Sequence, residues 1–130
     1  MIGLDTNIIL RYLVQDDPAQ SPKATARIEQ LSESKPGFIS LVVIAETAWS
    51  LKRFYRLSDI AVATTIERLL QASEFLVQDE QQVFYAVAAA KEGRASLPDA
   101  LIGALGSKAG CDHTLTFDRK AARLPQFELL

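Results

Sequence analysis

Three acidic residues occur where a strand is expected to end or a helix to begin, and a fourth lies inside an expected helix. They are Asp5 in LDTNIIL, Glu46 in LVVIAETAW, Asp99 in LPDALIGAL and Asp118 in LTFDRKAARL. At about 6 Å, two carboxylates repel by roughly 3 kcal/mol at an effective dielectric constant of about 20, so such a cluster needs cations. Oxygen ligands without histidine or cysteine favour Mg²⁺ or Mn²⁺ over zinc. These residues therefore indicate a site for a divalent metal ion.

Glu46 is the least ordinary of the four because its segment is otherwise apolar. In a helix it shares a face with Val42, Val43, Trp49 and Ser50. A carboxylate that faces a core costs several kcal/mol unless a cation or hydrogen-bond donors meet it. No capping role explains Glu46, since it lies beyond the first turn of its helix. We therefore expect Glu46 to face the core and to contact a cation or hydrogen-bond donors there.

The other three acids have ordinary structural alternatives. Asp5 could cap the helix that begins at Thr6, and Asp118 could cap the turn that follows it. Ser96 and Asp99 have the spacing of a capping box, in which the carboxylate of Asp99 would accept a hydrogen bond from the backbone N–H of Ser96. Taken singly, each of these acids favours a cap over a metal ligand.

The composition indicates one soluble domain that spans residues 1–130. The chain has 130 residues of which 48% are hydrophobic, which is enough for a core. Cys111 is the only cysteine, so neither a disulfide framework nor a cysteine-based zinc site can form within one chain. The N-terminus lacks a basic, cleavable signal, and no apolar run approaches the roughly 18 residues of a membrane span. We therefore expect a cytoplasmic protein that does not contact membranes.

The charge balance alone argues against nucleic-acid binding. Fourteen Lys and Arg residues face sixteen Asp and Glu residues, for a net charge of -2. The basic residues nevertheless gather in groups, and four of them are candidates for phosphate contacts: Arg11, Arg119, Lys120 and Arg123. A solvated helix face is the simpler interpretation of any single group.

Apolar patterning predicts alternating strands and helices. The expected strands span residues 2–5, 38–39, 75–77, 113–117 and 127–129. The expected helices span residues 6–13, 21–34, 57–71, 80–92 and 97–108, with Ser58 as the expected cap of the third, and a further helix capped by Ser40 carries Glu46. This order predicts an α/β fold of three α/β/α layers around a mainly parallel sheet of four to five strands. Ligands of such sheets bind at the carboxyl ends of the strands, where the four acids could converge.

Two further features concern packing. Gly103 and Gly106 lie on the Asp99 side of an expected helix, where each glycine costs roughly 1 kcal/mol relative to alanine. That cost indicates close packing against another part of the chain. The aromatic segment from Trp49 to Tyr55, followed by residues 57–70, is either a core face or a surface for a partner.

Over nearly its whole length the chain resembles the PIN-domain nucleases, and among them the VapC-type toxins of bacterial toxin-antitoxin systems. The resemblance rests on LDTNIIL, VVIAETAW, LPDALIGAL and LTFDRKAARL, in this order and spacing. It implies a Mg²⁺- or Mn²⁺-dependent endoribonuclease that leaves 5′-phosphate and 3′-hydroxyl ends. In that family the metal site uses the acids that correspond to Asp5, Glu46, Asp99 and Asp118. Supporting polar positions correspond to Thr6, Asn7 and Thr116.

The resemblance also implies partners, and it leaves alternatives open. VapC-type toxins form homodimers and are inhibited by a VapB-type antitoxin that covers the active site. Many relatives carry an extra acid where this chain has Ser96, a difference that weakens or alters a second metal position. A haloacid-dehalogenase phosphatase would need an acid at Asn7, and a response-regulator receiver would need an acid pair after the first strand. A PIN-like module that binds RNA or protein without cutting is the remaining alternative.

Overall fold

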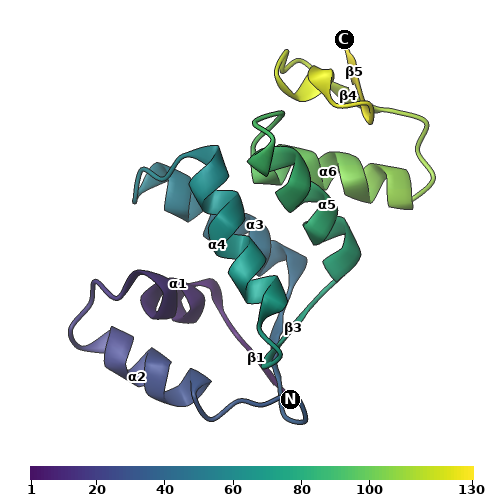
Figure 1. Ribbon diagram of the computed structural model, residues 1–130. Helices are drawn as coiled ribbons and strands as arrows, with labels where there is room; N and C mark the ends of the chain where they lie inside the picture. Colours follow the sequence, from purple (N-terminus) through teal and green to yellow (C-terminus); the bar gives the residue numbers. More distant parts are fainter.

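The computed structural model of residues 1–130 contains six α-helices, five short strands and one 3₁₀ turn (Figure 1). In chain order the elements are β1 (Ile2–Gly3), α1 (Thr6–Val14), α2 (Gln20–Ile28), β2 (Gly37–Ile39), α3 (Leu41–Arg53), α4 (Asp59–Gln71), β3 (Phe75–Val77), α5 (Glu80–Lys91), α6 (Leu97–Lys108), β4 (Thr114–Thr116), η1 (Ala121–Arg123) and β5 (Phe127–Leu129). The mixed α/β class with parallel strands is confirmed. No helix combines the length and apolar character needed to cross a membrane.

The strands form two parallel sheets instead of the single sheet that the sequence predicted. One has the order β1-β2-β3, with Gly3 paired with Phe38 and Phe38 with Leu76. The other consists of β4 and β5 alone, with Thr114 paired with Phe127. The two sheets lie at opposite ends of the molecule (Figure 1). Strands β1 and β4 therefore each have one neighbour and one unpaired edge.

The three-stranded sheet buries only one of its faces. Ile39 and Val77 are 0% and 4% exposed and lie on the covered face. On the opposite face Gly3 is exposed, Phe38 is half-buried and Leu76 is 46% exposed. Helices were expected on both faces of a parallel sheet, so this arrangement leaves apolar surface uncovered.

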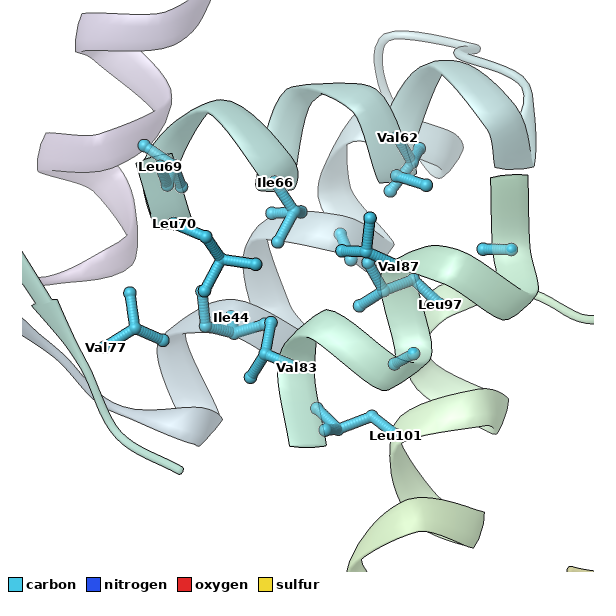
Figure 2. Close-up of a cluster of buried hydrophobic side chains, with 14 of the residues drawn as sticks. Ile44, Val62, Ile66, Leu69, Leu70, Val77, Val83, Val87, Leu97 and Leu101 are labelled. Atoms are coloured by element: carbon cyan, nitrogen blue, oxygen red, sulfur yellow. The ribbon is translucent and has the colours of Figure 1, made fainter. Parts of the chain in front are cut away.

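The main core lies between helices α3, α4, α5 and α6 (Figure 2). Ile66 of α4, Val83 of α5 and Leu97 of α6 are almost fully buried there. Each such side chain contributes about 1.5–3 kcal/mol through the apolar surface that it removes from water. Most of the apolar residues of α4 therefore belong to the core and do not form a surface for a partner.

Serine side chains fix where three helices begin. The hydroxyl oxygen of Ser40 accepts a hydrogen bond from the N–H of Val43 at 3.2 Å, and that of Ser58 accepts one from Ala61 at 3.1 Å. Ser96 caps α6 in the same way. These bonds satisfy N–H groups that have no partner within the helix. The caps predicted at Ser40 and Ser58 are confirmed.

Helix α2 ends at Ile28, well before the predicted end at residue 34. Ser32 and Lys35 form a tight turn in which each backbone N–H donates to the carbonyl oxygen of the other. The hydroxyl of Ser32 also accepts from the N–H of Lys35 at 3.2 Å. Serine competes with helical hydrogen bonding in this manner, and apolar patterning does not detect such competition.

Candidate active site

Two of the four predicted acids meet at the carboxyl end of β1. Asp5 follows this strand, and its Oδ1 accepts a hydrogen bond from the backbone N–H of Thr6 at 2.7 Å, which caps α1. The hydroxyl of Thr6 donates to Oε1 of Glu46 at 2.8 Å, across 40 positions in the sequence. One threonine thus holds two carboxylates, one that follows β1 and one from α3. They lie where ligands of parallel sheets bind.

The prediction that Glu46 faces the core was wrong. Its side chain lies on the exposed side of α3, next to Val42 and Trp49, which are 68% and 54% exposed. Val43 and Ser50 turn the other way and are buried. Helical spacing correctly placed these residues near Glu46, but it could not show which apolar residues another helix covers. An exposed carboxylate needs no buried cation to offset desolvation.

Asp99 lies apart from this pair, at the start of α6. Its backbone N–H donates to the hydroxyl oxygen of Ser96 at 3.3 Å, as expected for one half of the capping box. The residue lines a cavity of about 570 Å³ between α3, α4 and α6, together with Lys52 and Asp59. Asp99 therefore shares a cavity with one acid, Asp59, and two bases, Lys52 and Arg53, that were not assigned to the site.

Asp59 is a residue that sequence reasoning missed. Its carboxylate accepts hydrogen bonds from Nζ of Lys52 at 2.8 Å and from Nζ of Lys120 at 3.1 Å. Partial burial acts to raise the pKa of Asp59, but the hydrogen bonds and charges of the two lysines outweigh it and hold the pKa below its usual value. The sequence shows only an acid after a capping serine, because Lys120 lies 61 positions away and Lys52 belongs to the preceding helix.

Asp118 forms a cap at the far end of the molecule, beyond β4. Its Oδ1 accepts from the backbone N–H of Lys120 at 2.8 Å and of Ala121 at 2.9 Å. Thr116 supports this turn, since its hydroxyl oxygen accepts from the N–H of Asp118 at 2.9 Å. The basic residues that follow Asp118 consequently lie at this end of the molecule, away from Asp5.

The four acids do not form one site within a single chain. No group of three or more His, Cys, Asp or Glu residues is placed to hold a metal ion. The pair of Asp5 and Glu46 offers hard oxygen donors, and Mg²⁺ is commonly held by one or two carboxylates together with water and substrate phosphates. The pair therefore suits part of a magnesium site, whereas the complete set of four acids does not assemble.

A basic groove lies between α1 and α2 and includes Asn7, two residues after Asp5. It has a volume of about 250 Å³ and is lined by Asn7, Arg11, Lys23 and Arg27, among others. Lys23 and Arg27 were not singled out from the sequence, although their spacing of four residues places them on one face of α2. Three positive side chains in one groove could bind the phosphates of a nucleic acid.

Part of the positive charge of Arg11 is balanced within the chain. Its guanidinium lies 3.5 Å from Asp16 and 3.9 Å from Asp17. Hydrogen bonds from the backbone N–H groups of Gln20 and Ala19, with the charge of Arg11, hold the pKa of Asp17 below its usual value against a smaller desolvation effect. Arg11 therefore has a structural role in addition to any contact with phosphate.

A comparison with known protein families identifies the fold. The model of the PIN domain family matches residues 2–126. The chain belongs to the PIN-domain family. PIN domains are typically nucleases and commonly use divalent metal ions, so this chain has a nuclease-type fold. A comparison with curated proteins found no match.

In this PIN domain, Ser96 has a clear structural role. Its hydroxyl caps α6 directly before the turn that carries Asp99. The serine therefore orients the start of the helix but adds no negative charge to the cavity. Asp59 supplies an acid in that cavity, although its bonds to Lys52 and Lys120 balance its charge.

Proposed function

We propose that this PIN domain is a Mg²⁺- or Mn²⁺-dependent endoribonuclease and acts as the toxin of a VapBC-type pair. The observation that carries the proposal is the convergence of Asp5 and Glu46 on Thr6 at the carboxyl end of β1. The basic groove between α1 and α2 includes Asn7, which follows Thr6 directly in the chain. An acidic pair next to a phosphate-binding groove suits hydrolysis of a phosphodiester.

Charge explains why a metal ion belongs in the proposal. The phosphodiester of RNA is an anion, and Asp5 and Glu46 would repel it without a cation. A bound Mg²⁺ would neutralise part of this charge and lower the pKa of a coordinated water. The role of Thr6 is to fix one oxygen of Glu46, which leaves the second oxygen free. Asn7, Lys23 and Arg27 would bind and orient the RNA backbone.

An exposed aromatic pair supports the proposal of an antitoxin partner. Trp49 and Phe54 are 54% and 65% exposed, and their rings meet edge to face at 5.5 Å. The guanidinium of Arg53 lies 5.9 Å from the centre of the Trp49 ring. Aromatic and arginine side chains are enriched at protein interfaces. A VapB-type antitoxin that docks here would pass close to Glu46, which lies on the same side of α3.

The experiment that tests the proposal is cleavage of total cellular RNA by the purified protein. Wild type and Asp5→Asn are incubated with Mg²⁺, with Mn²⁺ and with EDTA. We expect discrete fragments that require metal, carry 5′-phosphates and disappear with Asp5→Asn. Cleavage that persists in EDTA, or in Asp5→Asn, would contradict the proposed site.

The second candidate is a PIN domain that binds RNA or protein without cutting. The observation that favours it is the separation of the acids, since no three of them come together in one chain. Isothermal titration of folded, antitoxin-free protein with Mn²⁺ separates the two functions. Absence of both Mn²⁺ binding and RNA cleavage would favour the non-catalytic module.

A further inference from the structure

A cavity of about 390 Å³ lies between α5, α6 and the segment before β5, and polar side chains dominate its lining. Val83 and Val87 point from α5 into the core (Figure 2), so Gln81 and Tyr85, two positions before each of them, face outward. The side chains that line this amide cavity, besides Ala104, are Gln81, Gln82, Tyr85, Ser107, Lys108 and Gln126.

The neutral polar groups of the amide cavity are free to bind a ligand. Gln78, in the turn before α5, uses its amide within the fold, since its Oε1 accepts a hydrogen bond from the N–H of Leu41 at 3.0 Å. No such bond within the chain occupies the three glutamine amides of the cavity or the hydroxyls of Tyr85 and Ser107. A primary amide offers a donor and an acceptor side by side. Three amides around one space therefore suit a planar ligand with donors and acceptors along its edge.

The amide cavity carries no unbalanced charge. Lys108 is its only charged lining residue, and the ammonium of this lysine pairs with the carboxylate of Asp79. An isolated phosphate would find no free cation there, and a metal ion would find no carboxylate in the lining. The lining therefore favours the neutral part of a ligand.

A second cavity, of about 220 Å³, adjoins the first, because Tyr85 and Gln126 line both. Its two charged residues, Glu92 and Arg94, pair with each other at 3.0 Å. Tyr85 is 64% exposed and separates the amide cavity from this apolar one. The remaining lining residues of the apolar cavity are Ala88, Ala89, Ala100, Leu124 and Pro125.

We propose that the two cavities bind two successive unpaired bases of an RNA strand, with Tyr85 between them. Unpaired bases are recognised by stacking on aromatic rings and by hydrogen bonds to their edges. Glutamine pairs with a base edge through both atoms of its amide, as it does with adenine. The edge of one base would meet Gln82 and Gln126, and the apolar cavity would take the flat face of the next. The choice of RNA as the source of the bases rests on the proposed function, whereas the match to a nucleobase does not.

The two cavities are reached from the edge of the sheet where Asp5 lies. Helix α5 begins at Glu80, shortly after the carboxyl end of β3. The carboxyl ends of parallel strands share one edge, so the first turn of α5 and Asp5 lie at the same edge of the three-stranded sheet. The bond from Leu41 to Gln78 ties this turn to α3, the helix that carries Glu46. An RNA strand held at Tyr85 can therefore continue towards the acidic pair.

Fluorescence anisotropy of a labelled, unpaired RNA strand measures the binding, and EDTA keeps the strand from being cut. Tyr85→Ala should lower the affinity by about 5- to 150-fold, the value of one lost base–aromatic stack. Tyr85→Phe keeps the ring and should retain most of the affinity. Phe84→Ala is the matched control, because Phe84 is 42% exposed on the same helix but lines neither cavity. An unchanged affinity in Tyr85→Ala, or an equal loss in Phe84→Ala, would overturn the proposal.

Substitution of the amides tests recognition of the base edge. Gln82→Met and Gln126→Met remove the amide but keep an unbranched side chain of similar length. Each should lower the affinity by about 2- to 10-fold, the value of a lost hydrogen bond. The slope of log affinity against log salt should stay as in wild type, because no cation is removed. Unchanged affinity in both variants, or a smaller slope, would contradict recognition by neutral amides.

Two further ligands distinguish the source of the base. The same RNA strand paired with its complement should bind wild type and Tyr85→Ala equally, since paired bases cannot stack on Tyr85. Adenosine monophosphate should bind much more weakly than the unpaired strand, because it fills only one of the two cavities. Equal affinity for the mononucleotide and the strand would assign the cavities to a soluble nucleotide and overturn the assignment to RNA.

The base site and the nuclease activity are separable in these measurements. A wild-type protein that binds the unpaired strand through Tyr85 but never cuts RNA would support the base site and contradict the nuclease alone. Metal-dependent cleavage by a protein whose strand binding does not depend on Tyr85 would overturn the base site alone.

Discussion

The hydroxyl of Thr6 donates a hydrogen bond to Oε1 of Glu46, and this bond joins the first turn of α1 to the middle of α3. The backbone N–H of the same threonine holds Asp5. Two carboxylates are thus kept together by neutral donors, although their charges repel. Thr6 acts here as the residue that positions the acids.

Thr6→Val removes the hydroxyl but keeps the size and branching of the side chain. We expect unfolding to become easier by about 0.5–1.5 kcal/mol in urea denaturation, the usual value of one hydrogen bond. RNA cleavage should fall by more than this loss of folded protein explains, because Glu46 loses its fixed oxygen. Thr6→Ser retains the donor and is the control. Equal cleavage of RNA by the valine and serine variants would show that the Thr6 hydroxyl has no role in the site.

Glu46→Gln tests the repulsion between the two carboxylates directly. The amide oxygen can still accept from Thr6, while the negative charge beside Asp5 is lost. We expect the metal-free protein to be equally stable or more stable in urea, and its affinity for Mn²⁺ in isothermal titration to fall. A clear loss of stability with unchanged Mn²⁺ affinity would show that Glu46 is purely structural.

Asp59→Asn should destabilise the protein at neutral pH by about 1–2 kcal/mol, since the side chain is only 16% exposed and loses charged hydrogen bonds to Lys52 and Lys120. The pKa of Asp59 is lower in the folded than in the unfolded chain. Its stabilisation is therefore complete above the unfolded pKa of about 3.9 and disappears as the pH falls through the folded value. Urea denaturation at pH 7 and pH 2.5 checks this sign. A difference between variant and wild type that is as large at pH 2.5 as at pH 7 would contradict it.

Gly103→Ala places a methyl group against the ring of Phe127, where the available distance is 2.7 Å. The better helix propensity of alanine gives back about 1 kcal/mol, but overpacking costs about 1–3 kcal/mol. We expect a net loss in urea denaturation, together with loosening of the small sheet. Phe127→Leu should partly restore stability in the double variant. Gly3→Ala is the matched control, because its new methyl group meets nothing within 4 Å.

Arg27→Gln tests the basic groove. If Arg27 contacts a phosphate, RNA affinity should fall and the slope of log affinity against log salt should become smaller by about 1. Filter binding at several salt concentrations measures both quantities. Arg68→Gln on α4 is the control, since this exposed arginine does not line the groove. Equal effects of the two substitutions would mean that only net charge matters.

Local sequence patterns predicted most of the secondary structure, because helix caps and strand-forming residues act over only a few positions. The serine caps at Ser40 and Ser58 and the strand Phe75–Val77 were predicted at their observed positions. Gly103 and Gly106 were expected to pack closely, and the contacts of Gly103 with Phe127 and of Gly106 with Thr114 confirm this. Each of these features depends on residues within a few positions or on the steric cost of one residue type.

The arrangement of the strands could not be predicted from such patterns. Whether β4 pairs with β1 or only with β5 depends on backbone groups far apart in the sequence, and both pairings have the same apolar signature. The orientation of Glu46 depends likewise on which face of α3 the other helices cover. The partners of Asp59 were missed because Lys120 lies 61 positions away. Sequence patterns therefore indicated the separate parts of the site but not their assembly.

The three-stranded sheet is complete at Val77 and contains no residue from the last third of the chain. During synthesis, the bond between Thr6 and Glu46 can form while residues 78–130 are still being added. At about 5–20 residues per second, the ribosome needs several seconds more to finish the chain. Asp118 leaves the ribosome near the end of that interval. For those seconds Asp5 and Glu46 are held together in a chain that has not yet acquired the turn at Asp118.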